Sequence, residues 1–245
     1  MSAVDSTPQR VGSGAWCIVA VAAVASWMYL TRHFEAMAGA GAGTTPKAEV
    51  SSTIKLPWFN RRAWLLAIFF GLCQFIAYAC IAWTAPWNSE VHASKIPGGE
   101  MLSLFMLFLA AGSFAAAVFG GAPDDRRLSL MLSGILSIVG LAGLAFVPTS
   151  YPAIFVMTVA FGQGMCFALG MVLPLDNTHS TDEAHAWSMF VLFVGYLVAA
   201  AGPLTFGFLR DKTGGFFDSY IMLILVSFAM MATIPLLERR PIPLV

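Results

Sequence analysis

Charged residues are scarce in this 245-residue chain, and their scarcity excludes most classes of soluble protein. Only 11% of the residues are charged and 58% are hydrophobic, and the mean hydropathy is +0.78. A soluble domain carries about 25% charged residues, because its surface faces water. We therefore expect an integral membrane protein. The 13 Lys and Arg residues balance 13 Asp and Glu residues, so net charge indicates no nucleic-acid partner.

Cysteine and the usual catalytic groupings are also sparse. The four cysteines lie inside apolar stretches, without the spacing of a metal site or a disulfide framework (Cys17, Cys73, Cys80 and Cys166). We expect them to be small packing residues. No Ser/His pair, paired Asp or His-Glu-x-x-His motif falls at membrane depth. The sequence therefore predicts no enzyme, no metal site and no cofactor.

Charge-free apolar runs predict seven transmembrane helices, since about 20 apolar residues cross the hydrocarbon core. The expected spans are residues 15–30, 63–89, 101–123, two within 128–175, 186–209 and 219–237. Pro148-Thr-Ser-Tyr-Pro152 is a turn signal that divides the long uncharged stretch 128–175 in two. Ser180-Thr-Asp-Glu183 fits a capping box at the start of the sixth span. The predicted fold class is an all-α integral membrane protein.

The spans suggest four parts of the chain. These are a tail with one transmembrane helix (1–31), a cytoplasmic linker (32–62), a six-helix bundle (63–237) and a cytoplasmic tail (238–245). Positive residues favour the cytoplasmic side of a membrane. Nine of the 13 Lys and Arg residues fall on one side of the expected spans: Arg32, Lys47, Lys55, Arg61, Arg62, Arg126, Arg127, Arg239 and Arg240. We expect a multi-pass protein of the inner or plasma membrane, with the amino terminus outside and the carboxyl terminus cytoplasmic.

The last six spans contain signs of an internal duplication. Ser103–Phe108 aligns with Ser188–Phe193, and Phe119–Asp124 aligns with Phe206–Asp211 after a two-residue slip. The second and fifth spans agree more weakly, through Phe70-Gly71 and Phe161-Gly162. A unit with three spans inserts upside down the second time. The sequence thus predicts a 3+3 inverted repeat, an architecture of secondary transporters.

Three stretches carry a resemblance to a known family. They are Phe75–Pro86, Asp124–Arg127, and the loop and helix with Thr181–Ala184, Ser188-Met189, Gly195–Leu197, Ala201–Pro203, Gly207 and Asp211–Gly214. In their order they resemble the carboxyl-terminal half of a major facilitator superfamily transporter, of the cyanate-transporter-like branch. By this resemblance residues 11–31 are helix six of that family and 32–62 its central loop. Helices one to five are absent, which implies a missing amino-terminal half as partner.

The resemblance also implies two gating features. Asp124, Asp125, Arg126 and Arg127 resemble a cytoplasmic turn that pairs with helix ends in one conformational state; the alternative is a plain topology signal. Gly202-Pro203 lies inside the sixth span, where proline removes a backbone hydrogen bond and bends a helix. The alternative there is static packing.

Uncharged polar residues are the candidates for solute binding, because no charged residue falls in the central part of a span. Gln74 and Tyr78 lie one turn apart on the second span, and Gln163 lies midway along the fifth. By the resemblance these spans line the central cavity, so we expect all three side chains on one concave surface. The alternative is hydrogen bonding between helices.

The leading hypothesis is transport of a small polar or anionic solute across the lipid bilayer by alternating access, with this chain as an incomplete carrier. The alternative is a non-transporting seven-helix protein, either receptor-like or a degenerate remnant. A retinal-type pigment needs a Lys in its last span, and residues 219–237 contain none. Substrate, coupling ion and direction are not encoded in any motif of the chain.

Overall fold

The computed structural model describes residues 28, 56–91, 95–119, 126–178 and 180–237. Apart from Met28, these belong to residues 53–245, the larger of two units into which the chain divides. Several predicted features lie outside the described residues: the first span apart from Met28, the rest of segment 1–31, most of linker 32–62, the tail 238–245, and Asp124 and Asp125.

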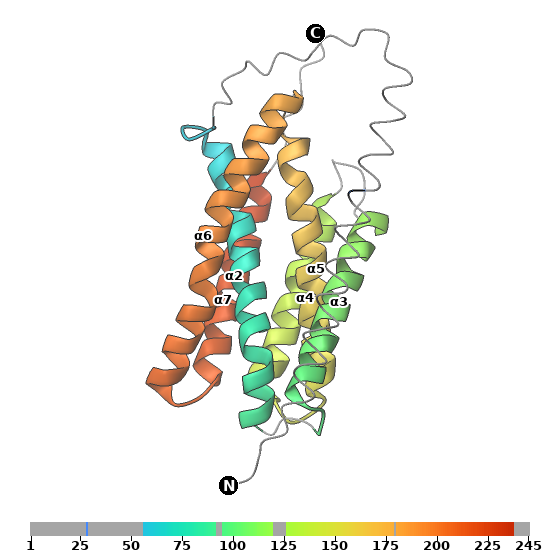
Figure 1. Ribbon diagram of the computed structural model, residues 1–245, viewed down its shortest axis with the longest axis vertical. Helices are drawn as coiled ribbons and strands as arrows, with labels where there is room; N and C mark the ends of the chain where they lie inside the picture. The colour runs from blue at the N-terminus through green and yellow to red at the C-terminus, as the bar shows by residue number, and fades with distance from the viewer. Residues whose placement is uncertain (1–27, 29–55, 92–94, 120–125, 179, 238–245) are drawn as a thin grey trace. The chain divides into compact units, whose positions relative to one another are not determined.

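Six long apolar helices make up the described part of the larger unit, and none of its residues lies in a strand (Figure 1). They are α2 (Arg61–Glu90), α3 (Gly98–Phe119), α4 (Arg126–Phe146), α5 (Pro152–Asp176), α6 (Thr181–Thr213) and α7 (Phe217–Thr233), which continues into the 3-10 helix η1 (Ile234–Leu237). Each is long and apolar enough to cross a membrane. The six spans predicted after residue 62 and the all-α membrane class are confirmed.

Local signals set the helix ends. The Asn60 side chain accepts hydrogen bonds from the backbone N–H groups two and three residues on, which caps α2. The Ser180 hydroxyl accepts from the backbone N–H of Glu183 at 3.2 Å, as the capping-box motif predicted. Gly214 ends α6 with a φ of 74°, a conformation that favours glycine. The predicted turn separates α4 from α5.

Two helix pairs, α2 with α6 and α3 with α5, make the most extensive contacts. Small residues bring the backbones together. A Cβ atom at Gly112 of α3 would lie 2.1 Å from the Phe161 carbonyl oxygen of α5, and one at Gly164 of α5 would lie 1.9 Å from the Leu109 carbonyl oxygen of α3. Each glycine therefore fits where no larger residue can.

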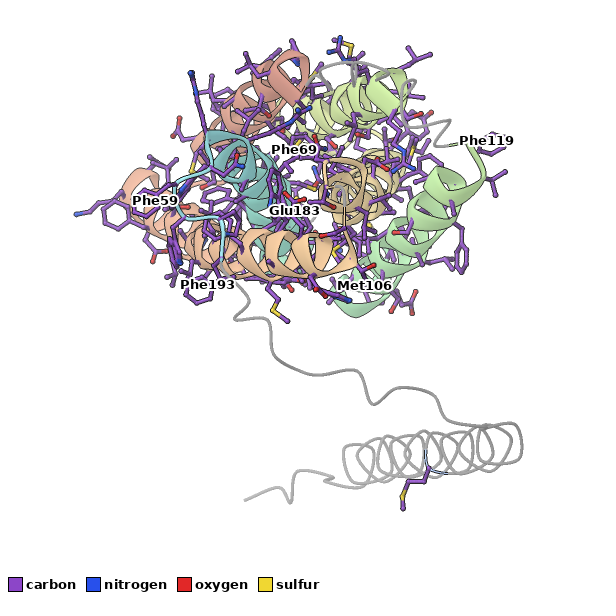
Figure 2. The ribbon with its side chains drawn as sticks, turned by 90° about the horizontal axis from the view of Figure 1, so that it is seen from above. Phe59, Phe69, Met106, Phe119, Glu183 and Phe193 are labelled. Carbon is purple, nitrogen blue, oxygen red and sulfur yellow. The ribbon has the colours of Figure 1, made fainter. Side chains whose placement is uncertain are left out.

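The helices differ in how much protein surrounds them. In the most apolar stretch of α2, 67% of the residues are buried, against 17% in α3. Seen from above, α5 lies in the middle of the group and α3 at its edge (Figure 2). Helices α2 and α5 therefore form the centre of the bundle, and most of α3 is left for lipid or for another protein surface.

Candidate functional site

The middle of each described helix is free of Asp, Glu, Lys and Arg. Every such residue in α2 to α7 lies within the first or last four positions of its helix. An intramembrane carboxylate usually marks proton coupling, and an intramembrane cation marks an anion site. In the described helices, chemistry at mid-depth therefore depends on uncharged polar groups.

Gln163 lies in a buried polar cluster that joins three helices. Its side chain is 0% exposed. Its Nε2 donates to Ser137 Oγ of α4 at 3.0 Å, and its Oε1 accepts from the Cys73 thiol of α2 at 3.4 Å. Gln74 is only 6% exposed, with its Oε1 3.9 Å from the same thiol. The two predicted glutamines therefore meet on Cys73 inside the bundle.

Tyr78 has a different environment from the glutamines. It is 39% exposed, and its ring lies against Tyr196 of α6 with centroids 6.2 Å apart. Tyr196 is 40% exposed and packs edge-on to buried Phe70 at 5.8 Å. The structure thus brings the two glutamines together and puts Tyr78 in an exposed aromatic pair. Contact of the three predicted residues with a solute stays a prediction.

Sequence reasoning missed Tyr196 and Ser137 as site residues. Tyr196 lies in a stretch that carries the family resemblance, but its partner Tyr78 is on another helix and no spacing rule connects them. Ser137 is one of several serines in an apolar run, and its bond to Gln163 distinguishes it from Ser133, which is equally buried. Both residues are recognised only by contacts between helices, which the sequence alone does not show.

Arg126, the third residue of the predicted gating turn, forms an ion pair. Its Nη1 lies 2.8 Å from Asp176 Oδ2, and the two side chains are 18% and 15% exposed. The pair joins the start of α4 to the end of α5. Arg127 is exposed, and Asp124 and Asp125 lie outside the described residues. One member of the motif is therefore seen paired with a helix end.

Gly202-Pro203 lies where α6 packs closely on α2. Helix α6 continues through Pro203 from Thr181 to Thr213. A Cβ atom at Gly202 would lie 2.3 Å from the Phe75 carbonyl oxygen. The carbonyl of Pro203 accepts from Trp83 Nε1 at 3.0 Å. In this conformation the dipeptide serves close helix packing, and its role in gating stays a prediction.

The ends of α2 and α6 farthest from Arg126 share a second charged contact. Arg210 pairs with Glu90, and its guanidinium carbon lies 5.7 Å from the Trp83 ring centroid and 5.3 Å from that of Phe216. Cation–π contacts of this kind add to an ion pair. Arg210 is one of the four Lys and Arg residues on the other side of the expected spans, and no motif pointed to it. The structure therefore adds a contact that holds α2, α6 and the start of α7 together.

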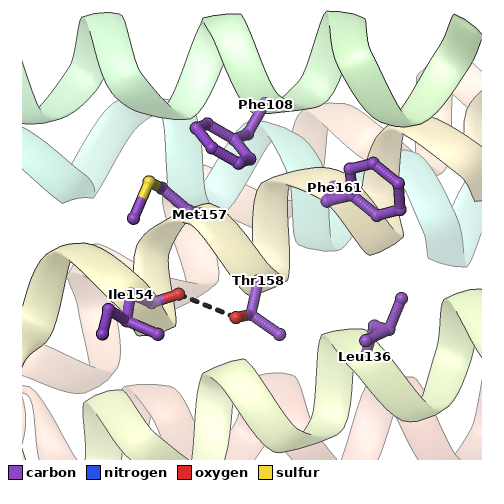
Figure 3. A pocket seen from close by; sticks show the side chains of 6 residues that line it. All are labelled: Phe108, Leu136, Ile154, Met157, Thr158 and Phe161. Atoms are coloured by element: carbon purple, nitrogen blue, oxygen red, sulfur yellow. Dashed lines mark hydrogen bonds between the residues drawn. The ribbon is translucent and has the colours of Figure 1, made fainter.

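An apolar groove of about 260 Å³ opens between α3, α4 and α5 (Figure 3). Its lining residues are Phe108, Leu136, Ile154, Met157, Thr158 and Phe161. The hydroxyl of Thr158 donates to the Ile154 carbonyl of its own helix at 2.7 Å. The groove therefore suits hydrocarbon better than a polar solute. Within the described residues, no group of three His, Cys, Asp or Glu side chains could hold a metal ion.

Known proteins place the chain in a family. No protein-family model matches it. It is 31% identical over 203 residues to the cyanate transport protein CynX of Escherichia coli (strain K12), covering 82% of this chain and 50% of the relative. It is 28% identical over 218 residues to the uncharacterized transporter YycB of Bacillus subtilis (strain 168), covering 89% of this chain and 52% of the relative.

A third match covers most of a shorter relative. The chain is 31% identical over 152 residues to the putative anionic 4-hydroxy-benzoate permease of Thauera aromatica, covering 62% of this chain and 81% of the permease. The chain spans about half the length of the two relatives from Escherichia coli and Bacillus subtilis. Six apolar helices are consistent with the carboxyl-terminal half of such a transporter. The chain belongs to the major facilitator superfamily of transporters, in the branch of the cyanate transport protein.

Proposed function

We propose that this chain forms half of a carrier that moves a small polar or anionic solute across a membrane by alternating access. The observation that carries the proposal is the match to transporters over most of the chain, 82% for the cyanate transport protein. The names of these relatives, cyanate transport protein and putative anionic 4-hydroxy-benzoate permease, indicate small anionic solutes. The receptor-like or remnant alternative has no comparable support.

A 3+3 inverted repeat is part of the proposal. In such a repeat, α2 corresponds to α5, α3 to α6 and α4 to α7. A contact between α2 and α6 in one copy then corresponds to a contact between α5 and α3. These are the two most extensive contacts of the bundle. The same correspondence relates α4–α5 to α7–α2, and both of these pairs are in contact. The helix pairing thus supports an approximate two-fold axis in the membrane plane, relating residues 63–147 to 152–237.

A second six-helix bundle completes the proposed carrier. Its place is next to α3 and α6, because α3 is the least buried helix and α6 exposes a row of large apolar side chains that includes Met189, Phe193 and Leu197. The chain spans about half of the relatives named above from Escherichia coli and Bacillus subtilis, which agrees with one bundle of two. Residues 15–30 add a seventh span in this proposal.

The orientation follows from the positive residues. The end of the bundle with Arg61, Arg62, Arg126 and Arg127 is cytoplasmic in the proposal, with the amino terminus of the chain outside and its carboxyl terminus inside. Green fluorescent protein fused after Thr178 should then fluoresce, because this reporter folds only in the cytoplasm. A fusion that is expressed normally but does not fluoresce would mean that the protein has the opposite orientation.

Two features give the carrier its moving parts. The Arg126–Asp176 pair closes the cytoplasmic end between α4 and α5 in one state and opens in the other. Gly202-Pro203 lets α6 change its bend, because proline lacks the N–H that would bond to the preceding turn. Tyr78 contacts the solute. Gln74 and Gln163 hold the helices behind Tyr78 together through their contacts with Cys73.

Solute uptake tests the proposal. The full chain is co-expressed with the amino-terminal half of the Escherichia coli cyanate transport protein, and uptake of radiolabelled cyanate and 4-hydroxybenzoate is measured. The same relative split at its central loop serves as the positive control. We expect uptake from the pair and none from either half alone. Failure of the pair to transport either solute, with both halves present in the membrane and the control active, would overturn the proposal.

A further inference from the structure

We propose that Tyr78 and Tyr196 together form the solute-binding surface of this bundle, and that the surface selects small planar solutes with a conjugated face. The inference rests on the proposed transport function and names the solute class of its site. Tyr78 lies near the middle of α2 and Tyr196 near the middle of α6, so both rings are at the same depth of the membrane.

The tyrosine pair packs on a buried ring, Phe70 of α2. The ring planes of Tyr78 and Tyr196 meet at 65° with centroids 6.2 Å apart. Phe70 is 1% exposed and meets Tyr196 at 89°, and it also contacts Phe167 of α5 with centroids 6.1 Å apart. The aromatic row therefore crosses from α2 and α6 to α5, the centre of the bundle. The two tyrosines are its exposed end.

The depth of the two tyrosines argues against a lipid-facing role. Tyrosine is enriched at the membrane–water interfaces, where its hydroxyl reaches water. At mid-depth a phenol hydroxyl that faces hydrocarbon finds no water, so only another protein group or a solute can pair with it. Two exposed phenols side by side, with Phe193 and Leu197 also exposed on α6, fit a surface that meets water or solute.

The chemistry of the pair indicates what it binds. Aromatic rings prefer edge-to-face or offset contacts, and rings at 65° present a face and an edge to a third ring. The hydroxyls donate to an acceptor on the rim of that ring. No charged side chain lies in the middle of any described helix, so this surface offers a solute rings and hydroxyls but no charge. A planar ring with a polar substituent can pack against both tyrosine rings and accept hydrogen bonds from their hydroxyls.

Binding of two matched amides tests the inference independently of transport. Benzamide is planar and aromatic, and cyclohexanecarboxamide has the same polar group on a puckered saturated ring. Saturation-transfer NMR on the full chain in lipid nanodiscs measures both, with empty nanodiscs as the control for partition into lipid. We expect benzamide to bind at least about fivefold more tightly. Equal binding of the two amides, or no binding of benzamide, would overturn the inference.

Variants of the chain locate the site. We expect Tyr78→Leu and Tyr196→Leu each to weaken benzamide binding by about three- to tenfold, the range of one aromatic contact. Phe193→Leu, an exposed aromatic side chain one turn from Tyr196 on the same helix, should leave binding unchanged. Tyr78→Phe and Tyr196→Phe keep the rings and report on the hydroxyls. An equal loss in Phe193→Leu would contradict the assignment, while cyanate uptake would still decide the transport proposal.

Discussion

At the residue scale, the side-chain amide of Gln163 explains how a polar group is tolerated in the middle of the bundle. Both of its polar atoms have partners on neighbouring helices, Ser137 of α4 and Cys73 of α2. An unpaired amide in hydrocarbon costs several kcal/mol, and a hydrogen bond between membrane helices contributes about 0.6–2 kcal/mol. The residue therefore holds three helices in register.

We expect Gln163→Leu to lower the free energy of unfolding by about 1 kcal/mol, because it removes two bonds between helices. Thr158→Val is the matched control on α5, since the Thr158 hydroxyl bonds only to its own helix among the described contacts and its loss should change little. Equilibrium unfolding of the purified chain in mixed micelles measures both. A Gln163→Leu chain of unchanged stability that has lost solute uptake would instead make Gln163 a solute ligand.

Residue types could be predicted at this scale, but their partners could not. The sequence singled out Gln74, Tyr78 and Gln163 because polar residues are rare in the spans. Gln163 and Cys73 are 90 residues apart, and Gln163 and Ser137 are 26 apart. Such pairs form only when helices pack, so no local pattern indicates which glutamine is buried and which tyrosine is exposed.

At the scale of helices, the contact between α3 and α5 depends on glycine. Gly164→Ala puts a Cβ atom 1.9 Å from the Leu109 carbonyl oxygen, so the two backbones must move apart. Overpacking of this kind costs about 1–3 kcal/mol. Gly99→Ala on α3 is the control, since a Cβ atom there meets nothing within 4 Å. Thermal unfolding should separate the two variants, and equal midpoints would contradict the close approach.

The Arg126–Asp176 ion pair should contribute to the stability of the contact between α4 and α5. Arg126 lies at the start of α4 and Asp176 at the end of α5, so each charge has the sign that its own helix dipole disfavours. Their mutual attraction offsets this. We expect Arg126→Asp or Asp176→Arg alone to destabilise the bundle by about 1–3 kcal/mol.

The charge-swapped double variant should recover that stability, because each new charge also suits its helix dipole. Unfolding of all four chains gives the coupling free energy between positions 126 and 176. Additive effects of the two substitutions would mean that the pair contributes nothing. A swap that restores stability but not uptake would separate the gating role from the structural one.

Helix positions were the part of the fold best predicted from sequence. Charged residues and capping signals bound the apolar runs, so the expected span 63–89 corresponds to α2 and the turn at Pro148–Pro152 separates α4 from α5. Packing partners were not predictable in the same way. Which helix lies at the centre depends on shape complementarity between small residues, and the runs of glycine and alanine occur in several helices alike.

At the scale of the whole molecule, the central claim is that the surface with Tyr78 and Tyr196 lines a water-filled path and does not face lipid. The claim rests on which helix surfaces are exposed in the bundle. Helix α3 and the outer row of α6 are left uncovered within the bundle, and the aromatic pair lies at mid-depth on the neighbouring surface. A carrier with a second bundle in place would enclose that surface, whereas the outer side of α7 would stay in lipid.

Cysteine accessibility tests this claim most directly. Tyr196→Cys and Leu225→Cys, in the middle of α7 and 62% exposed, are made in chains co-expressed with the amino-terminal half of the cyanate transport protein. Both are treated with a small membrane-impermeant thiol reagent, and the unsubstituted chain gives the background of the native cysteines. Thiols react as thiolates, which need water. We predict rapid labelling at position 196, slowed by solute, and none above background at 225. Equal labelling at the two positions would contradict the account.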